Sequence, residues 1–245
     1  FLPKDIVSGD FYWATRHKDN LIFCVADCTG HGVPGAFMSM LGISLLNEII
    51  SKEAYANVSD ILNLLRINII SSLKQEMITA KDKPSIIKKS LNKDGMDISM
   101  CILNKKTMEL QYAGANNPLY IIKAKADHST LIELKGDLST ESSTLVELKG
   151  DKMPISVHER MDSFSMQTIS LQKGDCIYLF SDGYADQFGG KMGKKLMYKT
   201  FKEMLTEISH HPVNIQRKEV EKYFRHWKGD HSQVDDVLVM GIKIL

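Results

Sequence analysis

The spacing of apolar residues predicts strands throughout the chain, with helices inserted as two consecutive pairs. Alternating or continuous runs of β-branched and aromatic residues, bounded by turn residues, predict strands at 6–14, 21–26, 98–103, 108–112, 119–123, 163–171, 176–181 and 237–244. Apolar residues at helical spacing predict helices at 35–50, 58–77, 195–208 and 213–227. Hairpin-like strands with paired helices favour an α+β sandwich over alternating βαβ units.

The composition is typical of one globular domain. At 43% hydrophobic and 25% charged residues, 245 residues are enough for one large core, so we expect a single domain over 1–245. The formal net charge is +1 without long basic runs, which predicts neither nucleic acid nor an anionic membrane as a partner.

The lengths of the apolar stretches and the positions of the cysteines indicate the cellular compartment. We expect no membrane contact, because no apolar stretch approaches the roughly 20 residues that span a bilayer. The four cysteines show no metal-binding spacing and lie mostly in apolar runs, which is typical of buried, reduced thiols. The domain is therefore expected to be cytoplasmic, even if the full-length protein is membrane-anchored.

Acidic residues stand at four predicted strand ends. They are Asp10 in "VSGDFYW", Asp27 in "VADCTGHG", Asp182 in "LFSDGYAD", and Asp235 with Asp236 in "QVDDVLVMG". One Asp-Gly at a strand end is usually a turn, but four such acids together favour a site. Converging carboxylates raise one another's pKa, and divalent cations compensate them. An oxygen-only ligand set favours magnesium or manganese, and two such ions about 3.5–4 Å apart can position water for attack on a phosphoryl group.

Five separated motifs carry a family resemblance over nearly the whole chain. They are "DIVSGDFYW", "VADCTGHGVPGAFMSM", "GANNPLYII", "YLFSDGYADQFGG" and "QVDDVLVMG", in this order. With them the chain resembles the SpoIIE-type branch of the PPM metal-dependent protein serine/threonine phosphatases. The resemblance implies a central antiparallel β-sandwich flanked by helix pairs. It also implies hydrolysis of phosphoserine or phosphothreonine by a metal-bridging hydroxide, without a phosphoenzyme, in bacterial signalling.

The resemblance also assigns roles at the metals. Carried over by position, Asp10 and Asp27 lie near both ions, and the backbone carbonyl of Cys28 completes one coordination shell. Asp182 and Asp235 complete the surroundings of the other ion. These acids are therefore the expected catalytic residues, acting through the bound manganese or magnesium and its water.

Three more acids receive weaker assignments. Asp236 follows where relatives have Asp or Asn, and a supporting role fits it better than direct ligation. A third metal, reported as a family trait, would be held by Asp182 together with Asp94 or Asp97 in "KDGMDIS". A solvated turn acid is the alternative for Asp94 and Asp97.

His31 in "TGHGVPG" has two interpretations. An imidazole with a near-neutral pKa can act as the general acid that protonates the departing serine or threonine oxygen. The classical members carry a histidine two positions after the matching aspartate, whereas His31 comes four after Asp27. That departure favours a histidine that shapes the loop. Arg16 receives no phosphate-binding role, because nothing in the sequence places it over the metals.

Two further segments stand out. Gly189, Gly190 and Gly193 predict a mobile flap, which in the resembled family lies near the site and touches the protein substrate. The neighbouring lysines either steer an acidic phosphoprotein or begin a solvated helix. The second feature is a repeat, "STLIELKGD" at 129–137 and "STLVELKGD" at 143–151, which we interpret as a duplicated surface hairpin without chemistry.

Partners follow from the resemblance. The expected substrate is a phosphorylated protein, with a STAS-type anti-sigma-factor antagonist as one candidate. An N-terminal sensor or regulatory domain and a homodimer are expected in the full-length protein. Two other functions stay open, a two-metal hydrolase for small phosphoesters and a catalytically silent binding module. The presence of all four expected acids disfavours the silent module.

Overall fold

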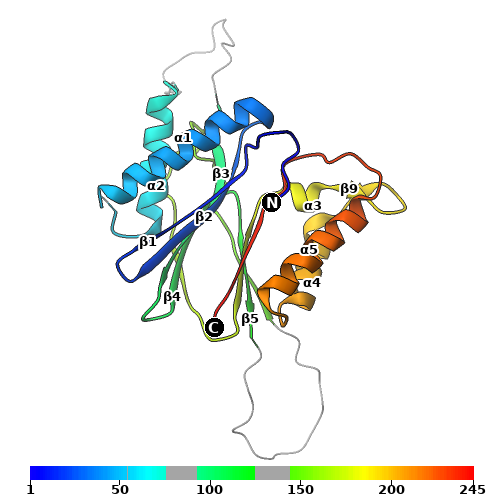
Figure 1. The fold of residues 1–245 in the computed structure, drawn as a ribbon. Helices are drawn as coiled ribbons and strands as arrows, with labels where there is room; N and C mark the ends of the chain where they lie inside the picture. The colour runs from blue at the N-terminus through cyan, green and yellow to red at the C-terminus, as the bar shows by residue number, and fades with distance from the viewer. Residues whose placement is uncertain (54, 76–92, 125–143) are drawn as a thin grey trace, which may run out of the picture.

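The computed structural model describes residues 1–53, 55–75, 93–124 and 144–245, and within them two antiparallel sheets pack face to face (Figure 1). Helices α1 (Gly32–Ser51) and α2 (Val58–Ser72) cover one sheet, and α4 (Met197–Ile208) and α5 (Val213–Lys228) cover the other. The predicted α+β sandwich with flanking helix pairs is confirmed.

The first sheet has five strands and the second has four. The order in the first is β1 (Phe11–His17), β2 (Asn20–Cys28), β3 (Met96–Asn104), β4 (Glu109–Ala115) and β7 (Gln167–Ser170). The order in the second is β11 (Val239–Lys243), β8 (Cys176–Phe180), β5 (Leu119–Lys123) and β6 (Thr144–Leu148). Three short elements follow β8, namely α3 (Gly183–Asp186), β9 (Phe188–Gly189) and β10 (Lys194–Lys195).

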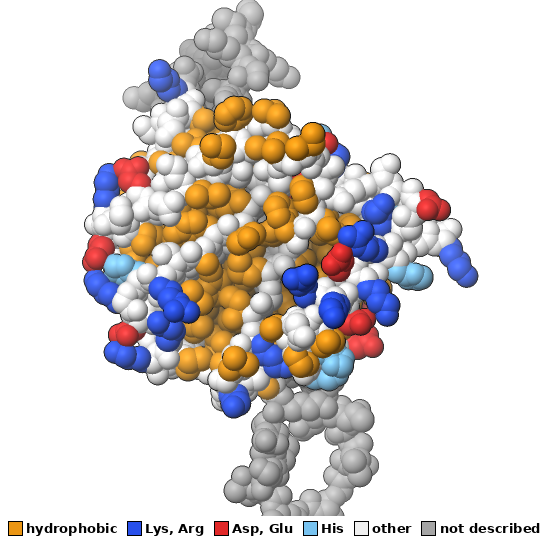
Figure 2. Space-filling view, in the orientation of Figure 1, with side chains coloured by type: hydrophobic (Ala, Val, Ile, Leu, Met, Phe, Trp, Pro, Cys, Tyr) orange, Lys and Arg blue, Asp and Glu red, His pale blue; other side chains and the backbone are white. Residues whose placement is uncertain are grey.

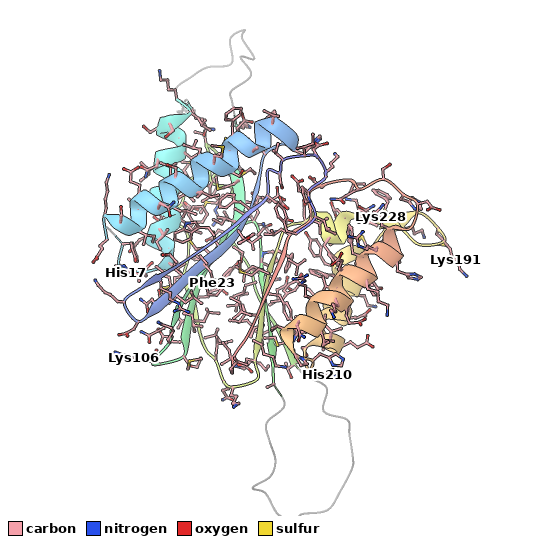
Figure 3. All side chains as sticks on the ribbon, in the orientation of Figure 1. His17, Phe23, Lys106, Lys191, His210 and Lys228 are labelled. Atoms are coloured by element: carbon pink, nitrogen blue, oxygen red, sulfur yellow. The ribbon has the colours of Figure 1, made fainter. Side chains whose placement is uncertain are left out.

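Three apolar layers hold the sandwich together. Along β2, Ile22 and Cys24 face the α1–α2 layer, whereas Phe23 and Val25 face the space between the sheets. Phe23 lies near the centre of the molecule (Figure 3). Side chains alternate along a strand, so a strand covered on both faces is apolar at every position. This explains why the pattern of β2 is continuous rather than alternating.

The structure corrects several predicted boundaries. The first strand begins at Phe11 and not at residue 6, and the Ile6 side chain is 99% exposed. The second helix ends at Ser72. The segment before Phe11 is irregular because its amides bind the Asp236 carboxylate. Lys4 N donates to Asp236 Oδ1 at 2.7 Å, and Gly9 N donates to Oδ2 at 2.9 Å.

The described residues include only the second copy of the repeat, from Thr144 onward. Its first copy, 129–137, lies outside the described residues. The second copy supplies β6, which pairs with β5 from Leu119↔Leu148 to Lys123↔Thr144. Lys202 of α4 binds Glu147 of β6 at 2.9 Å. The second copy is therefore an edge strand of the sheet, which the prediction of a surface hairpin missed.

Helix α1 corrects the expectation that no apolar stretch approaches membrane length. Its 20 residues are long and apolar enough, by length and composition, to cross a bilayer. Its inner face, however, packs on the first sheet through residues such as Leu46 and Ile49. That packing is typical of a core helix.

Glycines allow the first strands and α1 to approach closely. A Cβ on Gly35 would overlap with the carbonyl oxygen of Gly30 and lie 2.8 Å from Gly9 Cα. A Cβ on Gly9 would overlap with the same Gly30 oxygen. Gly30 itself has a φ of 84°, which favours glycine. The β2–α1 turn therefore depends on backbone-to-backbone packing that larger residues would prevent.

Replacing Gly35 tests this packing. Alanine normally stabilises a helix relative to glycine, but Gly35→Ala should lower the free energy of unfolding by roughly 2 kcal/mol, because the added methyl meets backbone atoms. Urea unfolding measures the change, with Ser44→Ala on the exposed side of α1 as the control. A Gly35→Ala protein as stable as the Ser44→Ala protein would contradict the close approach.

Candidate active site

An acidic pocket lies at one end of the sandwich. Its volume is about 230 Å³, and four carboxylates from separate parts of the chain line it, Asp27, Asp97, Asp182 and Asp235. Cys28 also contributes to the wall. The remaining lining residues are Thr29, Gly30, His31, Met96 and Pro154. The structure therefore brings together acids that are up to 208 residues apart, from Asp27 to Asp235 (235 − 27).

Strand direction places these acids at the same end. Asp27 is the penultimate residue of β2 and lies directly opposite Asp97 of β3 in the antiparallel register. Asp182 follows β8, and Asp235 lies in the loop that enters β11. Because β2 pairs antiparallel with β3 and β8 with β11, the end of one strand meets the start of its partner. Antiparallel strand pairing thus brings two acids from each sheet to the pocket.

Asp236 holds together the backbone segments around the pocket but does not line the pocket itself. Its side chain is 2% exposed, and its two oxygens accept the Lys4 and Gly9 amides. The neighbouring Gly183 packs so tightly on the Asp236 carbonyl that a Cβ would overlap with it. The glycine of "SDG" is thus required where β8 and the β11 loop meet. This geometry matches the predicted supporting role of Asp236.

Asp10 lies close to the other acids but does not line the pocket. It is 5% exposed, and its Oδ2 has no hydrogen-bond partner. Burial raises the pKa of Asp10 to about 7, with further contributions from the charges of Asp236, Asp235 and Asp182. A hydrogen bond from Ser181 partly opposes this rise in the pKa. Sequence analysis missed Ser181, although it directly precedes Asp182.

The pKa of Asp27 is raised further, to about 9. Burial is the main cause, followed by the charges of Asp10, Asp182 and Asp235. Burial also raises the pKa of Asp182, and a hydrogen bond with Asp27 opposes that rise. Such a bond between two carboxyl groups needs a proton on one of them. The metal-free site therefore holds protons that ordinary carboxylates release near pH 4.

Asp97 has a partner that the sequence did not indicate. Burial raises the pKa of Asp97, while a hydrogen bond from Asn116 lowers it. The Asn116 amide donates to Asp97 Oδ1 at 2.8 Å, from a turn in which Asn116 has a φ of 58°. Asn116 belongs to "GANNP", which the sequence indicated only as a turn. It therefore both forms the turn and orients an acid of the pocket.

The donor set fits hard divalent cations. Among the described residues, no three His, Cys, Asp or Glu side chains form a ready-made metal cluster. The carboxylates nevertheless repel one another, and Asp10 Oδ2 is buried without a partner. Oxygen-only surroundings of this kind suit magnesium or manganese and not zinc. A cation would compensate the charges that protons neutralise here.

Other candidates are placed at the edge of the site or away from it. Asp94 does not line the pocket; its backbone carbonyl accepts a hydrogen bond from Gln75 Nε2 at 2.5 Å. Arg16 pairs with Leu21, next to His17 at the far end of β1 (Figure 3). His31 lines the pocket, and its Nδ1 lies 2.7 Å from the exposed Asp5 carboxylate.

The glycine-rich segment forms the β9–β10 hairpin and packs on α5. Gly190 N donates to the Trp227 carbonyl at 2.8 Å, and Trp227 Nε1 donates to the Gln187 carbonyl at 3.0 Å. Lys191 lies at the tip, on the periphery of the molecule (Figure 3). No residue of the hairpin lines the acidic pocket. The predicted flap is therefore anchored on α5 through Gly190, although Phe188, Lys194 and Lys195 of the hairpin strands are exposed.

Comparisons with known proteins agree with this geometry. A family model, Stage II sporulation protein E (SpoIIE), matches residues 17–245. The SiaA-PP2C domain of Pseudomonas aeruginosa is similar over 100% of this chain and 84% of its own, at 24% identity and a TM-score of 0.79. The SpoIIE PP2C phosphatase domain of Bacillus subtilis, solved with a regulatory-domain fragment, is similar over 99% of this chain and 61% of its own, at 16% identity and a TM-score of 0.66.

A more distant structure was solved with metals. The catalytic domain of the serine/threonine phosphatase PstP, in complex with two manganese ions, is similar over 98% of this chain and 94% of its own, at 14% identity and a TM-score of 0.59. RsbX, at 13% identity and a TM-score of 0.58, was solved with magnesium. No curated protein sequence matches the chain.

The sandwich has the fold of PP2C-type phosphatase domains, with an acidic pocket at one end. The chain belongs to the SpoIIE family, as its five motifs predicted.

The raised pKa values predict how stability depends on pH. Between about pH 4 and the folded-state values near 7 and 9, folded Asp10 and Asp27 hold protons that the unfolded chain has released. The free energy of unfolding of the metal-free protein should therefore fall as pH rises through this window. Asp27→Asn should make the decline shallower, because one acid no longer titrates.

Thermal melting in chelator at about pH 6 and pH 9 measures the effect. Asp162→Asn is the control, because Asp162 is an exposed acid that pairs with Arg160 on the surface. Its melting temperature should fall with pH as much as that of the unsubstituted protein. Equal declines in melting temperature for the Asp27→Asn and Asp162→Asn proteins would show that the buried acids do not dominate the pH dependence of stability.

Proposed function

We propose that this chain removes phosphate from phosphoserine or phosphothreonine of a protein substrate, using two manganese or magnesium ions. One observation carries the proposal. Four carboxylates, Asp27, Asp97, Asp182 and Asp235, converge on one pocket near the buried Asp10, whose Oδ2 has no hydrogen-bond partner. A purely structural cluster of buried acids would be costly, because like charges without compensation destabilise the folded state.

The proposed metal ligands are residues in and next to this pocket. Asp10 and Asp27 would lie near both ions. The backbone carbonyl of Cys28 would complete the surroundings of one ion, and Asp182 and Asp235 those of the other. For a third ion, Asp97 is a better candidate than Asp94, because Asp97 lines the pocket beside Asp182. When bound, such ions lower the pKa of water and compensate the charge of the phosphoryl group.

The chain's own residues would prepare the site. Asp10 and Asp27 supply negative charge in a place where burial favours neutralisation, so cation binding and proton release are coupled. Asn116 orients Asp97, and Asp236 keeps the preceding segment beside Asp235. The volume of about 230 Å³ suits a phosphorylated side chain, while the rest of a protein substrate would lie outside.

Regulation belongs to the same proposal. The Bacillus subtilis SpoIIE neighbour includes a fragment of a regulatory domain, and this chain covers 61% of that chain. We propose that the present domain is the C-terminal output part of a longer signalling protein with a regulatory domain on its amino side. The proposal includes a homodimer of the full-length protein and a STAS-type protein as the substrate.

Neutralising the acids tests the catalytic proposal. Asp27→Asn and Asp182→Asn should each lower manganese-dependent turnover of a phosphoserine protein by more than about 100-fold, beyond the usual effect of outer partners of a metal ligand. Folding should persist, because the apolar layers and not the site supply the stability. Release of phosphate from a ³²P-labelled protein measures turnover, with chelator and the Asp162→Asn protein as controls.

The same assay separates the other functions. Near-normal turnover by both variants at saturating manganese would contradict the two-metal assignment. Good turnover of free phosphoesters with failure on phosphoproteins would favour a small-phosphoester hydrolase. Absence of turnover by the unsubstituted protein on either substrate, at every manganese concentration, would favour a binding module.

His31 requires a separate test. Its Nδ1 contacts Asp5 at the surface, which supports a histidine that shapes the β2–α1 loop. His31→Asn and Asp5→Asn should therefore lower kcat by similar factors of less than about tenfold, below the range of general acid catalysis. The pH profile of kcat should keep its shape. A loss above about 100-fold with a missing limb of the profile, for His31→Asn alone, would identify a general acid.

A further inference from the structure

Tyr198 stands in the first turn of α4, close to the acidic end of the second sheet. Its ring centroid lies 6.2 Å from the ring centroid of Phe180, which is two residues before Asp182. Three residues before Tyr198, Lys195 Nζ binds the Asp186 carboxylate at 2.7 Å. Contacts on both sides of the short helix α3 therefore place Tyr198 beside Asp182.

The backbone before Tyr198 has an unusual conformation. Leu196 N donates to the Gln187 carbonyl at 3.0 Å, where the β9–β10 hairpin ends. Met197 then has a φ of 72°, in the left-handed region that residues other than glycine seldom occupy. The Met197 side chain is 57% exposed, so its own packing does not account for this conformation. Strained backbone of this kind is concentrated at functional sites, and here it brings the next residue, Tyr198, onto Phe180.

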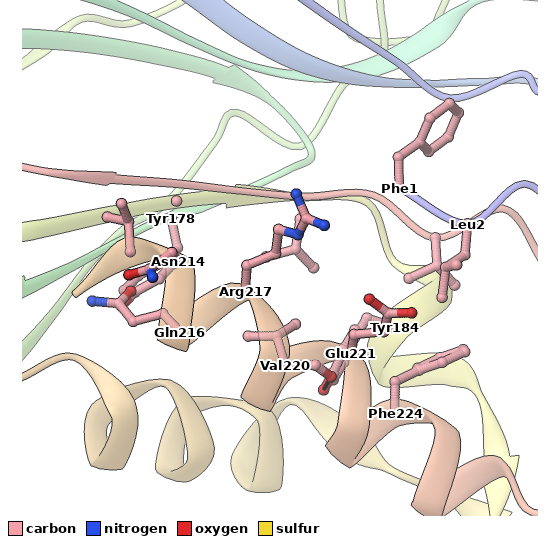
Figure 4. A pocket seen from close by; sticks show the side chains of 14 residues that line it. Phe1, Leu2, Tyr178, Tyr184, Asn214, Gln216, Arg217, Val220, Glu221 and Phe224 are labelled. Carbon is pink, nitrogen blue, oxygen red and sulfur yellow. Dashed lines mark hydrogen bonds between the residues drawn. The ribbon is translucent and has the colours of Figure 1, made fainter. Parts of the chain in front are cut away.

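The Tyr198 hydroxyl is an unused hydrogen-bond donor. The side chain is 37% exposed, and its hydroxyl makes no hydrogen bond with any residue that the structure describes. Two neighbouring tyrosines differ in this respect. Tyr178 donates to Gln216 Oε1 at 2.7 Å. Tyr184 donates to the Val220 carbonyl at 2.9 Å, and both of these tyrosines line an apolar groove beneath α5 (Figure 4).

The charges that act on this hydroxyl belong to the acidic end of the molecule. Burial raises the pKa of Tyr198 most, and four carboxylates raise it further, those of Asp182, Asp186, Asp27 and Asp97. Asp27 and Asp97 come from the first sheet, whereas α4 covers the second. Because such interactions weaken with distance, the hydroxyl lies close to the pocket that both sheets form. With its pKa raised, the phenol stays protonated and remains a donor throughout the neutral range.

The pocket itself offers few donors to a phosphoryl group. Among the residues that the structure describes, no lysine or arginine lines it. The Thr29 hydroxyl is already bonded to the Gly95 backbone, donating to the carbonyl at 3.3 Å and accepting from the amide at 3.2 Å. On the face that Figure 2 shows, lysine and arginine side chains instead gather over α5 and near the β1–β2 turn. A phosphoryl group among these carboxylates would therefore be stabilised by a neutral donor at the rim.

We propose that the Tyr198 hydroxyl donates a hydrogen bond to a non-bridging phosphoryl oxygen of the substrate and so helps to hold the phosphorylated side chain in the pocket. This inference rests on the proposed phosphatase function and adds a substrate-binding residue to it. A lysine or arginine in this place would pair with the neighbouring carboxylates, whereas a phenol donates to phosphate and leaves their charge in place. A hydrogen bond to a charged phosphoryl oxygen is also stronger than one between neutral groups. Because every phosphomonoester has such oxygens, the contact serves phosphoproteins and small phosphoesters alike.

Phosphate binding tests the contact without any activity measurement. Tyr198→Phe keeps the ring that contacts Phe180 and removes only the hydroxyl. Calorimetric titration of the magnesium-loaded protein with inorganic phosphate should give a Kd about tenfold higher for this variant, because a hydrogen bond to a charged group is lost. Tyr223→Phe is the matched control, because Tyr223 is a half-buried tyrosine of α5 that does not line the pocket. Its Kd for phosphate should equal that of the unsubstituted protein.

Turnover provides a second measurement. For Tyr198→Phe, the KM for a phosphoserine protein should rise by about tenfold, while kcat changes by less than about threefold. The reason is that the hydroxyl binds the phosphoryl group in the bound substrate and in the transition state alike. The KM for p-nitrophenyl phosphate should rise by the same factor. The Tyr198→Phe and Tyr223→Phe proteins should have similar melting temperatures, which excludes a general loss of structure.

Two results would overturn the proposal. The first is an unchanged Kd for phosphate with an unchanged KM in the Tyr198→Phe protein, which would leave packing on Phe180 as the role of the ring. The second is a rise in KM for the phosphoprotein alone, which would show that the hydroxyl contacts the polypeptide of the substrate and not its phosphate. An unsubstituted protein that binds phosphate but hydrolyses neither substrate would contradict the catalytic proposal, and the phosphate titration would still decide the role of Tyr198.

Discussion

The Asp236 carboxylate is the contact on which the arrangement of the site depends. It binds backbone amides of Lys4 and Gly9, more than 200 residues away in the sequence (236 − 9 = 227). It thereby places Asp10 at the start of β1, beside Asp182 and Asp235 at the end of the other sheet. Hydrogen bonds from backbone amides also stabilise a buried charge. Asp236 can therefore stay deeply buried while it organises the acids around it.

Stability and function conflict at this end of the molecule. The apolar layers bury side chains on both faces of each sheet and hold the strand ends in fixed positions. Those fixed ends bury carboxylates close together, at a cost that appears as the raised pKa values of Asp10 and Asp27, which burial raises most and neighbouring charges raise further. A rigid sandwich can maintain such repulsion, whereas a flexible loop would relax it.

The glycines of the motifs show how backbone packing supports the chemistry. Gly9, Gly30 and Gly35 let the β2–α1 turn lie against the start of β1, and Gly183 lets the end of β8 meet the Asp236 backbone. None of them contributes a side chain to the reaction. They allow segments to approach closely enough for acids on different strands to share one pocket. Part of the sequence resemblance therefore consists of glycines, which the motifs carry where backbone segments must lie close together.

Periodicity predicted most elements because burial imposes it directly. The strands and the four long helices follow from alternate and helical spacing of apolar residues. The irregular segment before Phe11 was missed, because its apolar residues look like a strand while a distant carboxylate binds its amides. Strand β6 was missed because it lies in a repeat that looks like a surface insertion, and its place in the sheet depends on pairing with β5.

The sequence by itself determined the kinds of elements, the acids at their ends and the family, because these depend on local spacing and residue type. Only the tertiary structure decided which acids meet. It brought Asp97 into the pocket and left Asp94 outside it, although the two acids are only three positions apart in the sequence. It gave Asn116 and Ser181 their acidic partners and packed the glycine-rich hairpin on Trp227. These outcomes follow from strand register and from contacts between distant segments, and no local pattern encodes the distance between two residues that only folding brings together.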